Sequence, residues 1–141
     1  MKILIVGSGG REHAIAASVA KSPRADKIYC APGNAGIAEY AECVDIGAME
    51  FEKLAEFAKE KEIDLCIVGM DDPLVGGLVD VLEDAGIRTF GPKKNAAILE
   101  GSKAFSKDLM KKSIFLRQDM RILQIQRKQS PILRMQSSLS Y

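Results

Sequence analysis

A short apolar run at residues 3–6 passes directly into a glycine cluster at residues 7–10, and a helical pattern follows at once. Four apolar residues that end at a glycine are typical of a buried parallel strand. The next helix therefore begins just beyond this strand. Its free backbone amides and the positive end of its dipole favour an anion, commonly a phosphate, and glycines let the backbone approach it closely. This segment predicts a phosphate-bearing ligand without specifying a reaction.

A dinucleotide-binding fingerprint is only half present in this segment. Gly7 and Gly9 fit its first two glycines, but Glu12 stands where the third glycine is expected. The second predicted strand, at residues 27–30, runs into residues 31–34 (APGN), where no carboxylate is available for a ribose hydroxyl. The sequence therefore disfavours a nicotinamide dinucleotide as the ligand.

Strand and helix patterns alternate along the first hundred residues. A helix is predicted at residues 50–60, with Phe51, Leu54, Phe57 and Ala58 on one face. A buried strand at residues 64–68 ends at Gly69.

A second helix is predicted beyond this strand, with Asp72 as its N-cap and Pro73 at its first position. Its apolar stripe is Leu74, Leu78, Val81 and Leu82, and Gly86 ends it. A last strand at residues 87–90 stops at residues 91–92 (GP).

This alternation predicts an α/β fold, a parallel sheet with helices on both faces. Ligands of such sheets bind at the carboxyl ends of the strands. Residues 7–10, 32–36 and 69–72 would meet there.

Composition limits the class of protein. Apolar residues make up 47% of the 141 residues, which suffices for a core, and no apolar run has the length of a membrane span. The N-terminus lacks the pattern of a signal peptide, so a cytoplasmic location is expected. Cys30, Cys43 and Cys66 lack paired metal-ligand spacing, and we expect buried thiols and no metal site.

The charge changes abruptly near residue 112. Residues 1–111 carry fourteen Lys and Arg against eighteen Asp and Glu, whereas residues 112–141 carry six against one. All five glutamines lie beyond residue 112, where Gly and Ala are absent. Two different compositions are joined at this point. A basic nucleic-acid-binding tail is one interpretation of the second.

Four motifs resemble the N-terminal, Rossmann-like (pre-ATP-grasp) domain of the phosphoribosylamine–glycine ligase family, also called glycinamide ribonucleotide synthetases. They are residues 5–14 (IVGSGGREHA), 31–36 (APGNAG), 91–92 (GP) and 99–105 (LEGSKAF) followed by Met110 and Lys111. Their order and spacing are similar to the family's over the first 112 residues. One departure is the segment after Gly69, Met-Asp-Asp, where the family more often has Pro-Glu.

The resemblance implies an ATP-dependent carbon–nitrogen ligase of purine biosynthesis. Such an enzyme joins glycine to 5-phosphoribosylamine, with ATP and Mg²⁺ (or Mn²⁺), through a glycyl phosphate. It implies an N-terminal domain at residues 1–100 and the start of an ATP-grasp unit at residues 101–112. The partners are then small molecules, with neither nucleic acid nor membrane involved. We expect no catalytic residue, no tightly bound cofactor and no ligase activity in this chain alone.

The resemblance also suggests roles for individual residues. Gly7, Gly9 and Gly10 would bind the ribosylamine phosphate, with Arg11 as its charge partner; a tight turn is the plain alternative. Further candidates, each with a structural alternative, are Glu12 (helix cap or ligand contact), His13 (structural or catalytic), Asn34 and Gly36 (sugar contacts or a turn), Asp71 (a hydroxyl or amine contact) and Lys103 (an ATP contact or a solvated lysine).

Residues 113–141 resemble nothing in the family, and a frameshift explains them. Read in the shifted frame, their codons can encode YIPTARYEDFTDSEKA and later AEFPIV, which are similar to the family's continuation. The sequence therefore predicts a non-native tail that is disordered or poorly packed. A stand-alone phosphosugar- or nucleotide-binding module is the alternative to a truncated ligase, and residues 99–103 favour the ligase.

Overall fold

The structure is a computed structural model of the chain, and it describes residues 1–112. Residues 113–141, on which the predicted frameshifted tail falls, lie outside the described residues. Met1–Ser106 form one compact unit, and Lys107–Tyr141 are assigned to a second.

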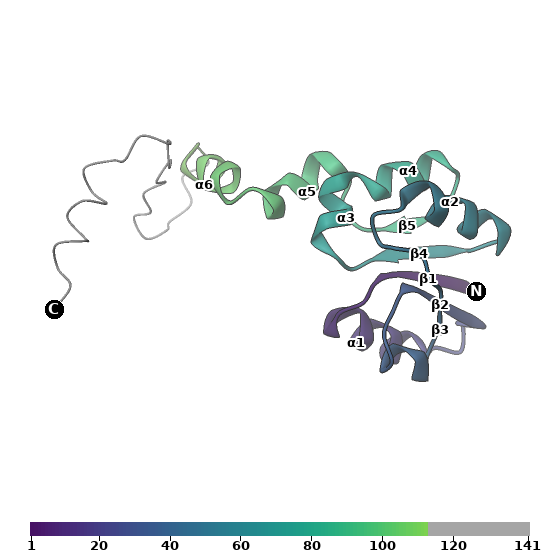
Figure 1. Cartoon of the computed structure of the whole chain (residues 1–141). Coiled ribbons are helices and arrows are strands. Elements are labelled where there is room, and N and C mark those ends of the chain that lie inside the picture. Colours follow the sequence, from purple (N-terminus) through teal and green to yellow (C-terminus); the bar gives the residue numbers. More distant parts are fainter. Residues whose placement is uncertain (113–141) are drawn as a thin grey trace, which may run out of the picture. The chain divides into compact units, whose positions relative to one another are not determined.

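Five parallel strands form a single sheet in the order β3-β2-β1-β4-β5 (Figure 1). The strands are β1 (Lys2–Gly7), β2 (Lys27–Pro32), β3 (Glu42–Cys43), β4 (Leu65–Val68) and β5 (Thr89–Phe90). In the central strand β1, Ile5 is the partner of Cys30 on one side and of Ile67 on the other. The predicted parallel sheet is confirmed.

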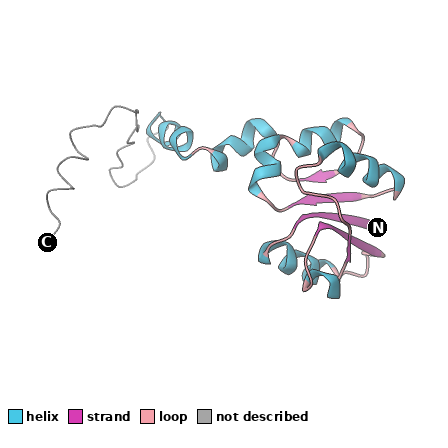
Figure 2. Ribbon diagram, in the orientation of Figure 1, coloured by secondary structure: helices cyan, strands magenta, loops and turns pink. Residues whose placement is uncertain are grey.

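Helices cover both faces of this sheet (Figure 2). The chain moves outward from β1 through β2 to β3, and then returns to β4 on the other side of β1. Since crossovers between parallel strands are right-handed, this reversal places the connecting helices on opposite faces. The helical elements are α1 (Gly10–Val19), η1 (Ile37–Glu39), α2 (Phe51–Glu60), α3 (Asp71–Gly76), α4 (Leu78–Asp84) and α5 (Lys94–Gly101).

Two core clusters reflect the alternating side chains of β1. Ile3 and Ile5 pack with Ala16 of α1 and Ile37 of η1 on one face. Leu4 and Val6 face the other way, into a larger cluster with residues of α2, α3 and α4. The period of two along a fully buried strand thus divides the core between the two helical layers.

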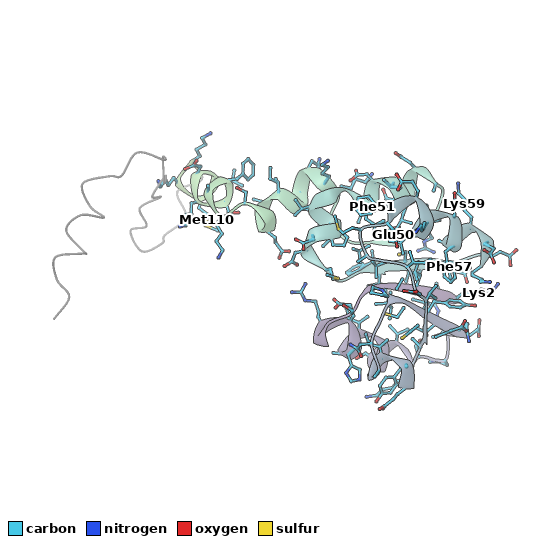
Figure 3. All side chains as sticks on the ribbon, viewed as in Figure 1. Lys2, Glu50, Phe51, Phe57, Lys59 and Met110 are labelled. Atoms are coloured by element: carbon cyan, nitrogen blue, oxygen red, sulfur yellow. The ribbon has the colours of Figure 1, made fainter. Side chains whose placement is uncertain are left out.

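The helix predicted at residues 50–60 is present as α2. Leu54, Ala55 and Ala58 are buried, and the larger Phe51 and Phe57 pack against the same cluster (Figure 3). The Phe57 ring meets Tyr29 of β2 edge-on, with 5.4 Å between the ring centroids. An amphipathic pattern with one apolar face therefore predicted this element well.

The prediction of one helix from Asp72 to Gly86 was wrong. The chain forms two helices there, because Gly77 adopts a left-handed conformation with φ of 101°. Met70, not Asp72, is at the N-cap of α3, and Asp72 lies within its first turn. Val79 is buried in place of Val81, which is 36% exposed. The predicted end of the second helix at Gly86, with φ of 83°, is correct.

Several edge elements also differ from expectation. The strand predicted at residues 87–90 is only two residues long, and β3, η1 and α5 were not predicted. Residues 101–112, predicted to begin an ATP-grasp unit, contain α6 (Lys103–Lys112). Within residues 1–112, no helix combines the length and apolar character that crossing a bilayer requires.

Cys30 and Cys66 are fully buried, as expected from their strand positions, but Cys43 is exposed. The expectation of buried thiols is therefore wrong for Cys43, because β3 is a short strand at the edge of the sheet.

Candidate functional site

The chain reverses its direction across the sheet between β1 and β4, and an open cleft lies at the carboxyl ends of these two strands. Its volume is about 440 Å³. In open parallel sheets, ligands bind at such reversal points. The cleft is lined by Ser8, Gly9, Gly10, Arg11 and Glu12 after β1, and by Gly69, Met70, Asp71 and Asp72 after β4.

The glycines after β1 shape the entry into α1. Gly7 has φ of 138°, and a Cβ atom there would lie 2.5 Å from Cγ of Glu12. Gly9 holds the N-cap position of α1 in an extended conformation, and Gly10 is the first helical residue. The backbone N–H groups of Gly10 and Arg11 have no hydrogen-bond acceptor within residues 1–112. These two amides, at the positive end of α1, are suited to an anion.

Glu12 is a buried carboxylate at the centre of this turn, with only 2% of its surface exposed. Its Oε2 accepts a hydrogen bond from the Gly9 amide at 2.7 Å. A Cβ atom at Gly69 would collide with Oε1 of Glu12, so the side chain fills the space between the ends of β1 and β4. The geometry therefore shows Glu12 capping α1 while it forms part of the cleft wall.

Arg11 and Asp71 connect the two sides of the cleft. The Arg11 guanidinium donates to the Gly69 carbonyl at 2.6 Å and to Asp71 Oδ1 at 3.0 Å. The hydrogen bond with Asp71 and the charge of Asp71 raise the pKa of Arg11. Both side chains are more than half exposed, so a ligand can reach them. Two residues predicted to bind a ligand are thus brought together, as partners of each other.

His13 lies away from this cleft. Its ring is 5.7 Å from that of Tyr40, centroid to centroid, and a Cβ atom at Gly36 would be 3.1 Å from His13 Cε1. These contacts pack α1 against the segment around η1.

Asn34 joins the loops that follow β1 and β2. Its Nδ2 donates to the Ser8 carbonyl at 2.7 Å, and its Oδ1 accepts from the Ile37 amide at 2.9 Å. The loop at residues 32–36 therefore supports the glycine turn, but neither Asn34 nor Gly36 lines the cleft. The prediction that residues 7–10, 32–36 and 69–72 meet is therefore correct only in part. The loop at residues 32–36 contacts the glycine turn, but it is not part of the cleft wall.

Lys103 is exposed at the start of α6 and does not line the cleft. Met70 lines it, although sequence reasoning did not single it out; its position between Gly69 and Asp71 was the available signal. Among residues 1–112 there is no group of three His, Cys, Asp or Glu side chains that could hold a metal ion.

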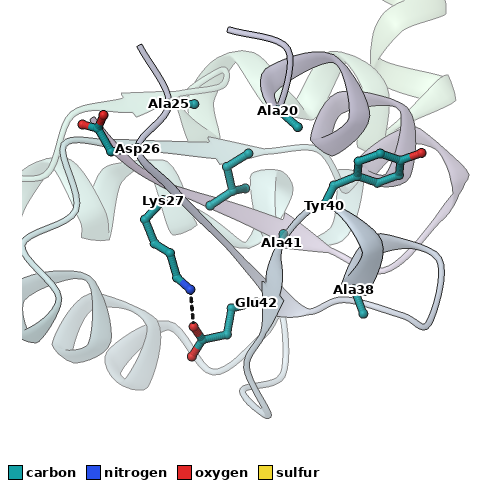
Figure 4. Close-up of a pocket in the computed structure, with 9 residues that line it drawn as sticks. Ala20, Ala25, Asp26, Lys27, Ala38, Tyr40, Ala41 and Glu42 are labelled. Carbon is teal, nitrogen blue, oxygen red and sulfur yellow. Dashed lines mark ion pairs between the residues drawn. The ribbon is translucent and has the colours of Figure 1, made fainter. Parts of the chain in front are cut away.

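A second open cleft, of about 500 Å³, lies near the amino ends of β2 and β3 (Figure 4). Four alanines, Tyr40 and the ion pair of Lys27 with Glu42, at 2.7 Å, contribute to its lining. No motif along the chain predicted this second cleft. Because the amino ends of parallel strands are not the usual ligand edge, the cleft beside β1 and β4 is the stronger candidate.

Comparison with known proteins identifies the family of this domain. The family model for the N domain of phosphoribosylglycinamide synthetase matches residues 1–100. The phosphoribosylamine–glycine ligase of Caldanaerobacter subterraneus is 57% identical over 112 residues, which are 79% of this chain and 27% of that protein. The ligase of Brucella melitensis is 58% identical over 109 residues, 77% of this chain and 26% of that protein. The chain thus spans about a quarter of the length of these relatives.

Solved structures agree with this assignment. The crystal structure of phosphoribosylamine–glycine ligase from Thermotoga maritima matches 79% of this chain and 25% of that protein, with a TM-score of 0.58 and 32% identity. The biotin carboxylase domain of a thermophilic 2-oxoglutarate carboxylase has a TM-score of 0.62 over 79% of this chain and 28% of its own, but only 19% identity, and so shows a shared fold alone. The chain belongs to the phosphoribosylglycinamide synthetase N-domain family.

Proposed function

We propose that this domain acts within a phosphoribosylamine–glycine ligase, which joins glycine to 5-phosphoribosylamine with ATP in purine biosynthesis. The identity of 57–58% with ligases of this name supports the assignment. The domain's own part is to bind the phosphoribosylamine in the cleft beside β1 and β4. The observation that carries this proposal is the pair of unpaired amides, of Gly10 and Arg11, that open into that cleft.

Each wall of the cleft suits one end of this substrate. The phosphate accepts hydrogen bonds from the amides of Gly10 and Arg11 and competes with Asp71 for the Arg11 guanidinium. Asp71, released from that pair, is then free to accept a hydrogen bond from a sugar hydroxyl or the amine. Glu12 holds the turn in place by occupying the Gly9 amide, so that the site exists before the ligand arrives.

The ligase reaction itself needs an activated carboxylate. A carboxylate is a poor electrophile, so ATP first converts glycine into glycyl phosphate. The amine of phosphoribosylamine then attacks the carbonyl carbon of glycyl phosphate, the C–O bond to phosphate breaks, and the nitrogen loses a proton as the amide forms. Holding the amine in a fixed position is the contribution of this domain.

The chain spans about a quarter of the length of its ligase relatives, and the main binding groups for ATP and Mg²⁺ are proposed to lie in the remaining parts of such a ligase. Lys103 stays a predicted nucleotide contact. It lies just beyond residue 100, where the N-terminal domain is predicted to end and the ATP-grasp unit to begin.

Titration with ribose 5-phosphate, observed by amide chemical shifts, tests the binding proposal. We expect shifts at the amides of Gly10 and Arg11, and none there with ribose. Arg11→Ala should weaken binding roughly ten- to hundredfold, as expected for about 1.5–3 kcal/mol from a charged hydrogen bond. Arg24→Ala, an exposed arginine outside the cleft, is the matched control. Shifts confined to the second cleft, or equal binding by Arg11→Ala, would refute the assignment.

A further inference from the structure

Two of the three cysteines are direct neighbours on adjacent strands. Cys30 of β2 and Cys43 of β3 are Cα partners in the parallel register. Neighbouring strands lie about 4.8 Å apart, and disulfides join residues whose Cα atoms are about 4.4–6.8 Å apart. The backbone therefore already holds the two residues at a distance that a disulfide can span.

The side chains of this pair border one small space. Paired residues of parallel strands point to the same face of the sheet. A Cβ atom at Gly33 would lie 3.5 Å from the Cβ of Cys30 and 3.2 Å from that of Cys43, and it would collide with Sγ of Cys43. Gly33 has φ of 74° and leaves this space open. No side chain at residue 33 separates the two cysteines.

The two thiols differ in exposure, and this difference determines which of them reacts first with an oxidant. Cys43 is exposed and is the first to meet a solvent-borne oxidant, whereas Cys30 is fully buried. Burial raises the pKa of Cys30 to about 12, so Cys30 remains protonated at neutral pH and Cys43 is the first of the two to react. Cys66, buried in the larger core cluster on β4, is not the partner of either cysteine in the strand register.

We propose that Cys30 and Cys43 form a redox-sensitive pair, which a peroxide converts into an intrachain disulfide. Cys43 attacks a peroxide oxygen and becomes a sulfenic acid, and the O–O bond breaks to release the first water. The sulfur of Cys30 then attacks Sγ of Cys43, the S–O bond breaks, and the second water leaves. Two thiols lose two protons and two electrons, and hydrogen peroxide gains them.

This modification reaches the loops beside the candidate site. In the reduced chain the Cys30 thiol donates to the Gly7 carbonyl at 3.3 Å, and the Cys43 thiol donates to the Asn34 carbonyl at 3.5 Å. A disulfide removes both donors at once. Because Asn34 also holds the Ser8 carbonyl, the change is passed to the turn that begins α1. Reversible disulfides of this kind are the form in which reducing compartments use cysteine pairs.

The test is to treat the reduced full chain with hydrogen peroxide and map its peptides without reduction. We expect a peptide pair joined through Cys30 and Cys43, with the mass of two hydrogens lost, that dithiothreitol separates. Cys43→Ser, at an exposed position that should not disturb folding, should abolish the link. Cys66→Ala, a change outside the pair, should retain it.

Two results would overturn the proposal. One is Cys43 oxidised to a sulfinic or sulfonic acid while Cys30 remains a free thiol in the folded chain. The other is a Cys43–Cys43 link between two chains with Cys30 unmodified. Since both results come from the wild-type chain, the proposal stays testable even if Cys66→Ala does not fold.

Discussion

Glu12 is the residue that most distinguishes this turn from a dinucleotide-binding one. A glycine at this position would let helix and strand approach closely, whereas here a carboxylate fills the gap and requires glycine at residues 7 and 69. The Glu12 side chain caps α1 by accepting a hydrogen bond from the amide of Gly9, the N-cap residue. A bound pyrophosphate would have to displace the Glu12 side chain from this turn. The missing third glycine of the dinucleotide-binding fingerprint agrees with this.

Replacing Glu12 should therefore destabilise the fold. We expect Glu12→Ala to lower the free energy of unfolding by about 1–3 kcal/mol, since the Gly9 amide loses its acceptor and a cavity opens. Glu12→Gln keeps the shape and an acceptor, and should cost less. Urea unfolding measures both, with Glu56→Ala, an exposed change in α2, as the control. Equal stability of Glu12→Ala and Glu56→Ala would contradict the capping role.

The buried cysteines predict how stability changes with pH. Burial raises the pKa of both Cys30 and Cys66 from 9.0 to about 12. Between these values the unfolded chain loses thiol protons that the folded chain keeps. Stability should therefore be unaffected by these thiols below pH 9 and fall as the pH rises toward 12.

Urea unfolding from pH 8 to pH 11 measures how the free energy of unfolding changes with pH, both in the parent chain and in Cys66→Ala. Cys66→Ala should show a shallower decline than the parent chain. Iodoacetamide at pH 8 offers a second readout, since it should label Cys43 in the folded chain and all three cysteines only after unfolding. Identical slopes for the two chains would argue against the raised pKa of Cys66.

At the scale of the elements, Gly77 decides that α3 and α4 are two helices. Gly77→Ala places a side chain at φ of 101°, and we expect a loss of about 1–2 kcal/mol in urea unfolding. Gly10→Ala is the matched control, because Gly10 has no neighbour within 4 Å of a built Cβ and begins a helix. A stabilised Gly77→Ala would mean that the two helices can join into one.

The sequence predicted those elements whose own residues specify them. The apolar runs of β1 and β4 and the amphipathic face of α2 needed no tertiary information. The break between α3 and α4 at Gly77 could not be predicted, because Leu74, Leu78 and Leu82 keep a helical spacing across it. β3 is set by pairing with β2 rather than by its own two residues.

The candidate site was predicted in part for the same reason. The glycine turn and the segment at residues 69–72 were found from their positions after strands. That Arg11 pairs with Asp71, and that Asn34 supports Ser8 instead of lining the cleft, depends on how loops meet in three dimensions. Spacing along the chain carries no information about either contact.

For the whole molecule, the expected outcome is binding without catalysis. The chain spans about a quarter of the length of the ligases it matches. We expect the 141-residue chain to release no phosphate from ATP in the presence of glycine and phosphoribosylamine. Phosphate release that depends on both substrates would contradict this expectation. The full-length Caldanaerobacter subterraneus ligase is a suitable positive control.

The change of composition near residue 112 makes a prediction about the gene. We expect sequencing of the DNA that encodes residues 111–115 to find that a base is added or missing there. Correcting that base should restore the reading frame of the ligase. An unaltered sequence would make residues 113–141 authentic and would favour the stand-alone binding module.

The central place of β1 in the sheet has a consequence for the order of synthesis. Residues 2–7 are translated before both of their partner strands, β2, complete at Pro32, and β4, complete at Val68. The strand with the most buried residues in the domain therefore waits with one edge unpaired while some sixty further residues are translated. Nascent chains are exposed to mispairing at this free edge of β1 during the interval.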